Sequence, residues 1–430
     1  MNEKIPEIYF FLLFSLIPIS IIVGPAVSLM NILLIDLSFI ILILYKKNFE
    51  FLSNKTIKLI LLLCLYLIFN SIISKDFSIG AARNFGFIRF AILFIAFNYF
   101  FYNKVFFNKI LIVWTIILIG LSLDTYIESY FGKNILGYGE QYGSRIVSFF
   151  KDEPVVGGYI NGFYLVIIGY LFSLRKSFSN KYRYIILILS LFFLTAILLT
   201  GERSNTIKAF LGFFTFYFFN DLFKLKEKIF SILLVVFMLA FVLIKSPFLE
   251  VRYNKQFLQP IIYLLKSNEE KKNIEIDFQH RNYKTNTYYK LYRSGFSVFK
   301  NYPIFGVGNK NYRVETCGEK VNPAGIRPFL YECNTHTHQV YTEFLAEHGL
   351  IGSMILFYIL FNLIFNKIKV ILTSKNYVQL GSLIFLVSVF IPLLPTGAFF
   401  ADFNLTIFWV NLSLMYSINK KTNIFSKLNI

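Results

Sequence analysis

Long apolar segments recur along almost the whole chain, and they limit the possible folds more than any other feature. About twelve of them are candidates for transmembrane helices, each of which needs roughly 20 apolar residues. Their expected positions are 8–27, 30–45, 59–74, 85–101, 110–126, 156–173, 184–200, 204–220, 229–246, 349–366, 377–395 and 400–417. With 56% hydrophobic and 16% charged residues, the chain fits neither a soluble globule nor a disordered protein. We expect an all-α polytopic membrane protein.

The distribution of Lys and Arg predicts which side of the membrane each loop faces. With the N-terminus inside, the inner loops carry most of the basic residues, for example Lys46, Lys47 and Lys104. The short outer loops hold Lys75, Arg83, Lys133, Arg145, Lys151 and Arg203. Because cytoplasmic loops are enriched in Lys and Arg, both termini are expected in the cytoplasm. The net charge of +19 is then mainly a topology signal, and nucleic acid is not an expected partner.

One connection is far longer than the others and lies on the outer side of this topology. The predicted organisation is therefore transmembrane segments at 1–246, an outer loop domain with short helices at 247–348, and transmembrane segments with a cytoplasmic tail at 349–430. Loops of this length are usually functional. This one contains His280, His336, His338, His348, Cys317 and Cys333. Any chemistry is therefore expected on the outer side.

The two cysteines of the loop could pair, because an outer compartment is often oxidising. A disulfide between Cys317 and Cys333 would close a loop of about 16 residues and contribute roughly 3 kcal/mol in the chain-entropy model. Two free thiols are the alternative. A metal site is disfavoured, since the chain has no CxxC or HxxxH spacing and His336 and His338 have no obvious third ligand.

The densest polar constellation lies at the end of the loop, from Asn334 to Gly352. Residues 339–348 contain no helix breaker, so we expect a short helix there, capped by Thr335 or Thr337. His338 would then lie in the first turn, where the helix dipole disfavours protonation. A neutral imidazole suits a general base that activates a hydroxyl group. The alternative is a histidine with a structural hydrogen bond.

Arginines in three outer segments are candidates for binding an anion. Arg203 lies in the short turn 200–205, where Ser204 or Asn205 is expected to cap the next helix, and Lys208 lies one turn further in. Arg145 belongs to the earlier loop 144–154, and Arg313 follows a turn with a proline and two glycines at 303–308. Each of these side chains could instead simply extend to the membrane interface.

Two charged residues lie within predicted spans. Arg89 and Asp36 have opposite charges, and each lies one or two turns from the outer face. Charges inside a membrane usually pair with each other or face a polar cavity. We expect these two to pair.

Together these motifs resemble the O-antigen ligase/O-antigen polymerase family of bacterial envelope glycosyltransferases. The resemblance lies in the histidine pair followed by a polar residue, an aromatic residue and Glu-x-Gly at 335–352, and in the Pro-x-x-Gly-x-Gly turn at 303–308 with Tyr312-Arg313 and Cys317. The Arg-containing turn at 201–204 and the loop 145–154 also match. Two positions depart from the family pattern: Gln339 stands where Asn is frequent, and Thr337 where Pro is frequent.

The resemblance implies an inverting, metal-independent glycosyltransferase of the bacterial inner membrane. A glycan on undecaprenyl pyrophosphate would be moved, at the periplasmic face, to a hydroxyl of lipid A-core or of another lipid-linked glycan. His338 would be the catalytic base, and Arg203 and Arg145 would bind the pyrophosphate. His336, Arg313 and Glu347 would have secondary roles, and no cofactor is expected. A transporter or flippase of lipid-linked oligosaccharide is the alternative, although the halves show no internal repeat.

Overall fold

The computed structural model describes residues 4–139, 145–151, 153–174, 182–258, 287–317 and 331–425. His280 lies outside the described residues. The first half of this part is helical with short connections. Its helices are α1 (Lys4–Ser15), α2 (Ile17–Val23), α3 (Pro25–Lys46), α4 (Lys55–Ile72), α5 (Phe77–Phe85), α6 (Ile88–Phe100), α7 (Lys104–Phe131), α8 (Val156–Ser173), α9 (Tyr182–Leu199), α10 (Arg203–Phe219) and α11 (Leu225–Lys245). No strand occurs among the described residues.

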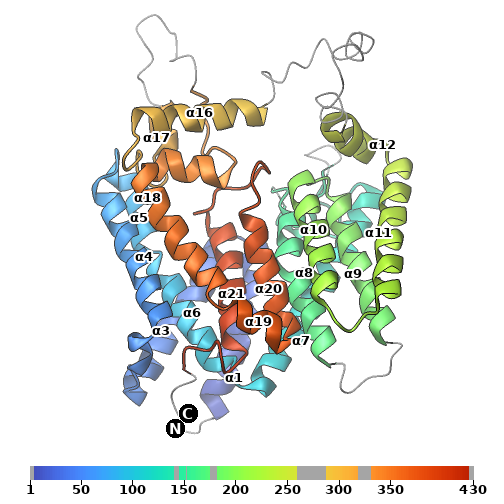
Figure 1. The fold of residues 1–430 in the computed structure, drawn as a ribbon, viewed down its shortest axis with the longest axis horizontal. Coiled ribbons are helices and arrows are strands. Elements are labelled where there is room, and N and C mark those ends of the chain that lie inside the picture. Colours follow the sequence, from blue (N-terminus) through green and yellow to red (C-terminus); the bar gives the residue numbers. More distant parts are fainter. Residues whose placement is uncertain are drawn as a thin grey trace, which may run out of the picture.

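The second half adds several short helices and the last long ones. They are α12 (Pro247–Leu249), α16 (Thr287–Asn301), α17 (Tyr312–Cys317), α18 (Val340–Phe365), α19 (Ile368–Ser374), α20 (Tyr377–Val389) and α21 (Asp402–Ser417). A π-helical segment, Glu250–Leu258, follows α12, and 3-10 turns occupy Glu50–Ser53 and Ser148–Phe150. In Figure 1, α16 and α17 lie at one end of the bundle, and α1 and the segment after α21 lie at the other. The described ends of the chain are therefore on the same side.

Eight helical segments are long and apolar enough to cross a membrane. They are Pro25–Lys46, Lys55–Ile72, Phe77–Phe100, Lys104–Phe131, Val156–Ser173, Tyr182–Leu199, Leu225–Lys245 and Val340–Ser374, with Tyr377–Val389 as a shorter apolar helix. The chain is thus a multi-pass membrane protein. Each predicted span contains a helix, but the first is divided among α1, α2 and the start of α3. The predicted span 377–395 is too long, because α20 ends at Val389. The count of twelve spans and the cytoplasmic termini stay predictions, as does the three-domain division, although α18 runs across the expected boundary at residue 348.

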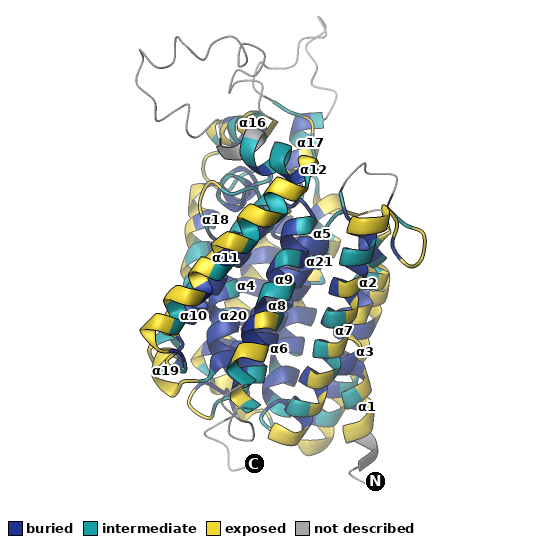
Figure 2. Ribbon diagram, turned by 90° about the vertical axis from the view of Figure 1, so that its right-hand side faces the viewer, coloured by how far each residue is buried: buried dark blue, intermediate teal, exposed yellow. Residues whose placement is uncertain are grey.

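The core of the bundle is formed by α8, α20 and α21, which are buried along most of their length, whereas α11 has an exposed outer face (Figure 2). Two glycines explain how closely α8 and α20 pack. A Cβ on Gly169 would lie 2.3 Å from the backbone oxygen of Tyr377, and one on Gly381 would lie 2.4 Å from that of Leu165. Small residues allow helix backbones in membranes to approach in this way. The closely packed α8–α20 pair therefore provides a rigid support for the residues at the end of the bundle that carries α16.

The expected pairing of Arg89 with Asp36 is wrong. Arg89 instead forms an ion pair with Asp402, the first residue of α21. The same carboxylate oxygen lies 2.9 Å from a guanidinium nitrogen of Arg83, whose Nη1 also donates to the backbone oxygen of Phe400 at 2.9 Å. Asp402 therefore joins α5 and α6 to the start of α21. Asp36 is buried, and both of its carboxyl oxygens lack a hydrogen-bond partner among the described residues.

Candidate active site

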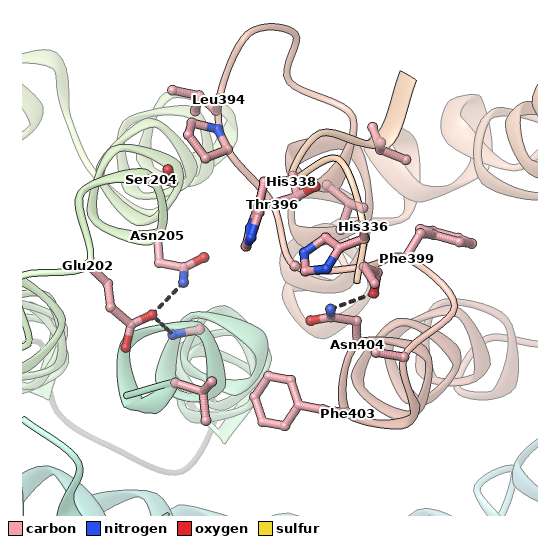
Figure 3. Close-up of a pocket in the computed structure, with 18 of the residues that line it drawn as sticks. Glu202, Ser204, Asn205, His336, His338, Leu394, Thr396, Phe399, Phe403 and Asn404 are labelled. Atoms are coloured by element: carbon pink, nitrogen blue, oxygen red, sulfur yellow. Dashed lines mark hydrogen bonds between the residues drawn. The ribbon is translucent and has the colours of Figure 1, made fainter. Parts of the chain in front are cut away.

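A cleft of about 1170 Å³ is lined in part by residues of α16. We call the end of the bundle that carries α16 and α17 the outer end, and the opposite end the inner end (Figure 1). The walls of the cleft also come from α8, α10, α20, α21 and the segments that precede α10 and α18. Most of the predicted site residues lie on this cleft: Arg145, Arg203, Arg313, His336 and His338. These residues come from positions as far apart in sequence as 145 and 338, so the fold brings them together. Figure 3 shows part of the cleft, with the two histidines facing the Glu202–Asn205 turn.

The backbone around His338 differs from the sequence prediction. Helix α18 begins at Val340, and its N-cap is Gln339, whose side chain accepts a hydrogen bond from the backbone N–H of Thr342 at 2.9 Å. Thr335 and Thr337 are therefore not the cap, and His338 is not in the first turn. It precedes the cap with φ 57°, a left-handed conformation that is rare for residues other than glycine. Such conformations concentrate at functional sites.

The two imidazoles lie close together. Their ring centroids are 3.9 Å apart, and the ring of Tyr288 on α16 lies 6.0 Å from that of His338. Burial lowers the pKa of His338 below its usual value, although hydrogen bonding to the Thr396 backbone opposes this effect. The pKa of His336 falls to about 3, mainly through burial and further through the neighbouring His338 and Lys310. Both rings are thus neutral near pH 7, because of desolvation rather than a place in the first helical turn.

A connecting segment between α20 and α21 forms one side of the cleft, and we call residues 390–401 the strap. The strap contacts the histidine segment directly, since the N–H of Thr396 donates to the backbone oxygen of His338 at 2.8 Å. Both carboxyl oxygens of Glu343 on α18 accept from the N–H of Phe399, at 3.0 and 3.1 Å. Glu343 is 1% exposed. This buried carboxyl, which the sequence analysis missed, holds the strap against the helix that follows His338.

The glycine turn at 303–308 packs against protein rather than against a ligand. The N–H groups of Val307 and Gly308 donate to the backbone oxygens of Ala346 and Glu347, at 3.0 and 2.8 Å. Gly349, with φ 63°, forms a kink in α18 there, and a Cβ at this position would lie 2.4 Å from the backbone of Ile304. The expected break before the tenth span therefore occurs at Gly349, and the turn fits into it.

Glu347 lies behind the cleft. Its side chain is buried, and one carboxyl oxygen accepts from the N–H of Tyr312 at 3.4 Å, while the other has no hydrogen-bond partner among the described residues. Arg313, the next residue of α17, is exposed and lines the cleft. Cys317 at the end of α17 is joined by a disulfide to Cys333, three residues before His336. The disulfide and Glu347 thus connect α17 to the histidine segment and α18.

Arg203 lies at the start of α10, opposite the histidines. The N-cap is Glu202, so the prediction that Ser204 or Asn205 caps this helix is wrong. Glu202 accepts hydrogen bonds from the N–H groups of Gly157 and Gly158, at 2.7 and 3.1 Å, and from the Asn205 side chain at 2.6 Å. The carboxylate therefore occupies the N-terminus of α8 and holds the turn that carries Arg203 against it.

A third arginine completes a cluster that the sequence analysis did not find. Arg252, in the π-helical segment after α12, donates from Nε to the backbone oxygen of Gly201 at 2.9 Å. Burial lowers its pKa, and the positive charges of Arg203 and Arg145 lower it further. Arg252 is therefore close enough to Arg203 and Arg145 to be affected by their charges. All three line the cleft, and we call them the arginine cluster. Like charges gathered in a cleft are the usual arrangement for binding an anion.

The charge of the cleft is strongly positive. Its lining includes seven cationic side chains but only two carboxylates, Glu153 and Glu202. The cations are Arg83, Arg145, Arg203, Lys208, Arg252, Lys310 and Arg313. No group of three metal-ligating His, Cys, Asp or Glu side chains occurs in the described part of the chain. The arrangement suits a ligand with several negative charges, next to the neutral imidazole of His338, which can accept a proton.

Part of the chain that forms this cleft is similar to a known protein family. Residues 187–357 match the model of a family described as O-antigen ligase. The matched segment includes Arg203, Arg252, His336 and His338, whereas Arg145 precedes it. The resemblance seen in the motifs is thereby confirmed, and it supports an O-antigen ligase-like function in surface glycan biosynthesis. A search of curated proteins found no match to the chain.

Proposed function

We propose that this protein transfers a glycan from undecaprenyl pyrophosphate to a hydroxyl group of an acceptor sugar. The premise is the match of residues 187–357 to the family model described as O-antigen ligase. The observation that carries the proposal is the cleft itself, in which two neutral histidines face the arginine cluster. A transfer from a lipid pyrophosphate requires both a cationic site for the leaving group and a base for the acceptor.

The arginine cluster would bind the pyrophosphate of the donor. Arg203 and Arg145 are the principal residues, because arginine offers fixed, bidentate donors and stays charged at every physiological pH. As the bond to the sugar breaks, negative charge develops on the pyrophosphate, and cations that lie in place already stabilise that charge without rearrangement. The repulsion among the arginines falls when the anion binds. The leaving group carries more negative charge than the intact donor, so the arginines would bind it more strongly.

His338 would act as the general base. The acceptor hydroxyl forms a bond to the anomeric carbon of the donor sugar, while the bond from that carbon to the pyrophosphate oxygen breaks. The proton of the hydroxyl passes to a ring nitrogen of His338, and the electron pair of the broken bond stays on undecaprenyl pyrophosphate. Because the histidines and the Glu202–Asn205 turn face each other across the cleft (Figure 3), the hydroxyl would attack from the side opposite the leaving group, which inverts the anomeric configuration.

The remaining candidates would support this chemistry without touching the reacting atoms. His336 is neutral and packed against His338, which suits a role in orienting that ring or a sugar hydroxyl. Arg313 is exposed at the edge of the cleft and is a candidate for acceptor binding. Glu347 is buried behind the cleft, and its role would be to fix α17 against α18. The mechanism requires no metal ion, because the arginines take the part that a divalent cation plays in many glycosyltransferases.

The proposed setting is the bacterial inner membrane, with the cleft facing the periplasm. The acceptor would be lipid A-core in a ligase, or another lipid-linked glycan in a polymerase. A lipopolysaccharide ladder from a deletion strain tests the proposal and separates these acceptors. Loss of all attached O-chains indicates a ligase, and attachment of a single repeat indicates a polymerase. A normal ladder of lipopolysaccharide and of other surface polysaccharides would contradict the proposal.

The pH dependence of the transfer follows from the lowered pKa of His338. A histidine acts as a general base only when its ring is neutral. Because the pKa of His338 is lowered, its ring becomes protonated only at a more acid pH. We therefore expect the acid limb of kcat/KM to be centred below the ordinary histidine pKa of about 6.5. A His336→Gln variant should show the same profile, since the pKa of His336 is about 3. An acid limb centred at or above the ordinary histidine pKa would contradict the assignment.

A further inference from the structure

Lys208 is a cationic residue that has no role in the proposed mechanism. It lies on α10, five residues after Arg203, and therefore about 7.5 Å further along the helix axis from the outer end. It lines the cleft although it is only 7% exposed. Among the described residues, no ion pair or hydrogen bond to its ammonium group is found. A buried charge without a partner is costly, and inside a membrane protein it usually marks a functional site.

In the described part of the chain, no carboxylate forms an ion pair with Lys208. The nearest carboxylate in sequence is Glu202, whose oxygens already accept hydrogen bonds from Gly157, Gly158 and Asn205. The walls of the cleft at this depth are largely apolar. They are formed by Ile207 on α10, Phe385 on α20 and Ile407 and Phe408 on α21. The cleft therefore changes from a cationic outer part to an apolar inner part that contains a single ammonium group among a few uncharged polar side chains.

This order of groups matches the order of groups in a lipid-linked donor. Such a molecule has an apolar chain, then a phosphate, a second phosphate and finally a sugar. We propose that Lys208 binds the phosphate on the lipid side, while the arginine cluster binds the phosphate on the sugar side. The inference rests on the proposed function and adds the direction in which the donor lies. The polyprenyl chain then follows the apolar wall of α10, α20 and α21, and the sugar points toward His338.

The test uses the purified full-length protein and measures the dissociation constants of two probes, undecaprenyl phosphate and undecaprenyl pyrophosphate. Lys208→Met keeps the length of the side chain and removes its charge, so it should weaken binding of both lipids by at least about tenfold. Lys208→Arg should bind both within about threefold of the wild type. Arg203→Ala should weaken binding of the pyrophosphate alone, because the monophosphate does not reach it. Lys109→Met, at an exposed position on α7, is the matched control and should change neither constant.

Thermal melting of the same variants separates binding from folding. If Lys208 serves to bind a ligand and not to stabilise the fold, removing its unpaired charge should leave the melting temperature of the free protein unchanged or raise it. A lower melting temperature would mean that the protein itself uses the charge, and would overturn the inference. Equal binding of both lipids by Lys208→Met and the wild type would overturn it as well. If the wild type bound neither lipid, the proposed function would fail together with the inference.

Discussion

Replacing His338 with Asn should lower the rate of glycan transfer by at least about a hundredfold, because a positioned general base contributes about 10²–10⁴ to the rate. Asn is the informative substitution. It tolerates the left-handed backbone conformation at this position, φ 57°, better than Ala does. The backbone contact between Thr396 and residue 338 should therefore survive. Donor affinity should stay within about threefold of the wild type, since the lost group acts on the acceptor.

His336→Asn is the matched control for this experiment. The two rings share the same segment and lie 3.9 Å apart, so a general disturbance of the cleft would affect both variants equally. His336 is a far weaker base, with a pKa near 3, and its Nδ1 already lies 3.0 Å from the Thr335 hydroxyl. Its replacement should therefore cost much less activity. A variant at 338 that retained the wild-type rate, or equal losses at 336 and 338, would rule out His338 as the base.

Removing one arginine of the cluster should have the second large effect, this time on the donor. A hydrogen bond to a charged group contributes about 1.5–3 kcal/mol, so Arg203→Ala or Arg145→Ala should raise the dissociation constant of the donor by about 10- to 100-fold. Arg203→Lys keeps the charge but loses bidentate geometry, and should recover only part of the affinity. If both arginines bind the same pyrophosphate, their effects should not be additive. The loss of binding free energy for the donor in the double variant should then differ from the sum of the losses in the two single variants.

Arg183 provides the control for charge alone. It lies at the inner end of α9, where its guanidinium group is 3.4 Å from Glu227, and it does not line the cleft. Arg183→Ala should leave donor affinity unchanged. If Arg203→Ala had no more effect than Arg183→Ala on the dissociation constant of the donor, the arginine cluster would not be the pyrophosphate site.

The helices of this chain could be predicted well because apolar residues in a membrane must form helices. Span length and the positions of polar breaks are local properties, and segments such as 156–173 match α8 in both bounds. The division of the first span was missed, although Gly24 and Pro25 form a recognisable break within an apolar run. Likewise, the N-cap of α18 is Gln339 instead of a threonine, because all of the polar residues before an apolar run are possible caps.

The candidate site was found only in part, and what was missed depends on contacts between distant segments. Arg203 and His338 belong to recognisable local motifs. Arg252 does not, because it joins the cluster only when the segment after α12 folds back onto Gly201. The role of Glu343 requires Phe399 of the strap, which comes 56 residues later, and the sequence contains no sign of that contact. The pairing of Arg89 with Asp402 instead of Asp36 was missed for the same reason.

The central claim is that the chain itself makes a glycosidic bond with a pyrophosphate leaving group. The most direct measurement incubates the purified protein with a glycan on undecaprenyl pyrophosphate, an acceptor glycolipid and excess chelator, and follows both products. We predict one released undecaprenyl pyrophosphate for each glycan attached to the acceptor, with the anomeric configuration inverted. Movement of the donor across a vesicle membrane without any new bond would instead identify a transporter, and activity that required magnesium would contradict the role given to the arginines.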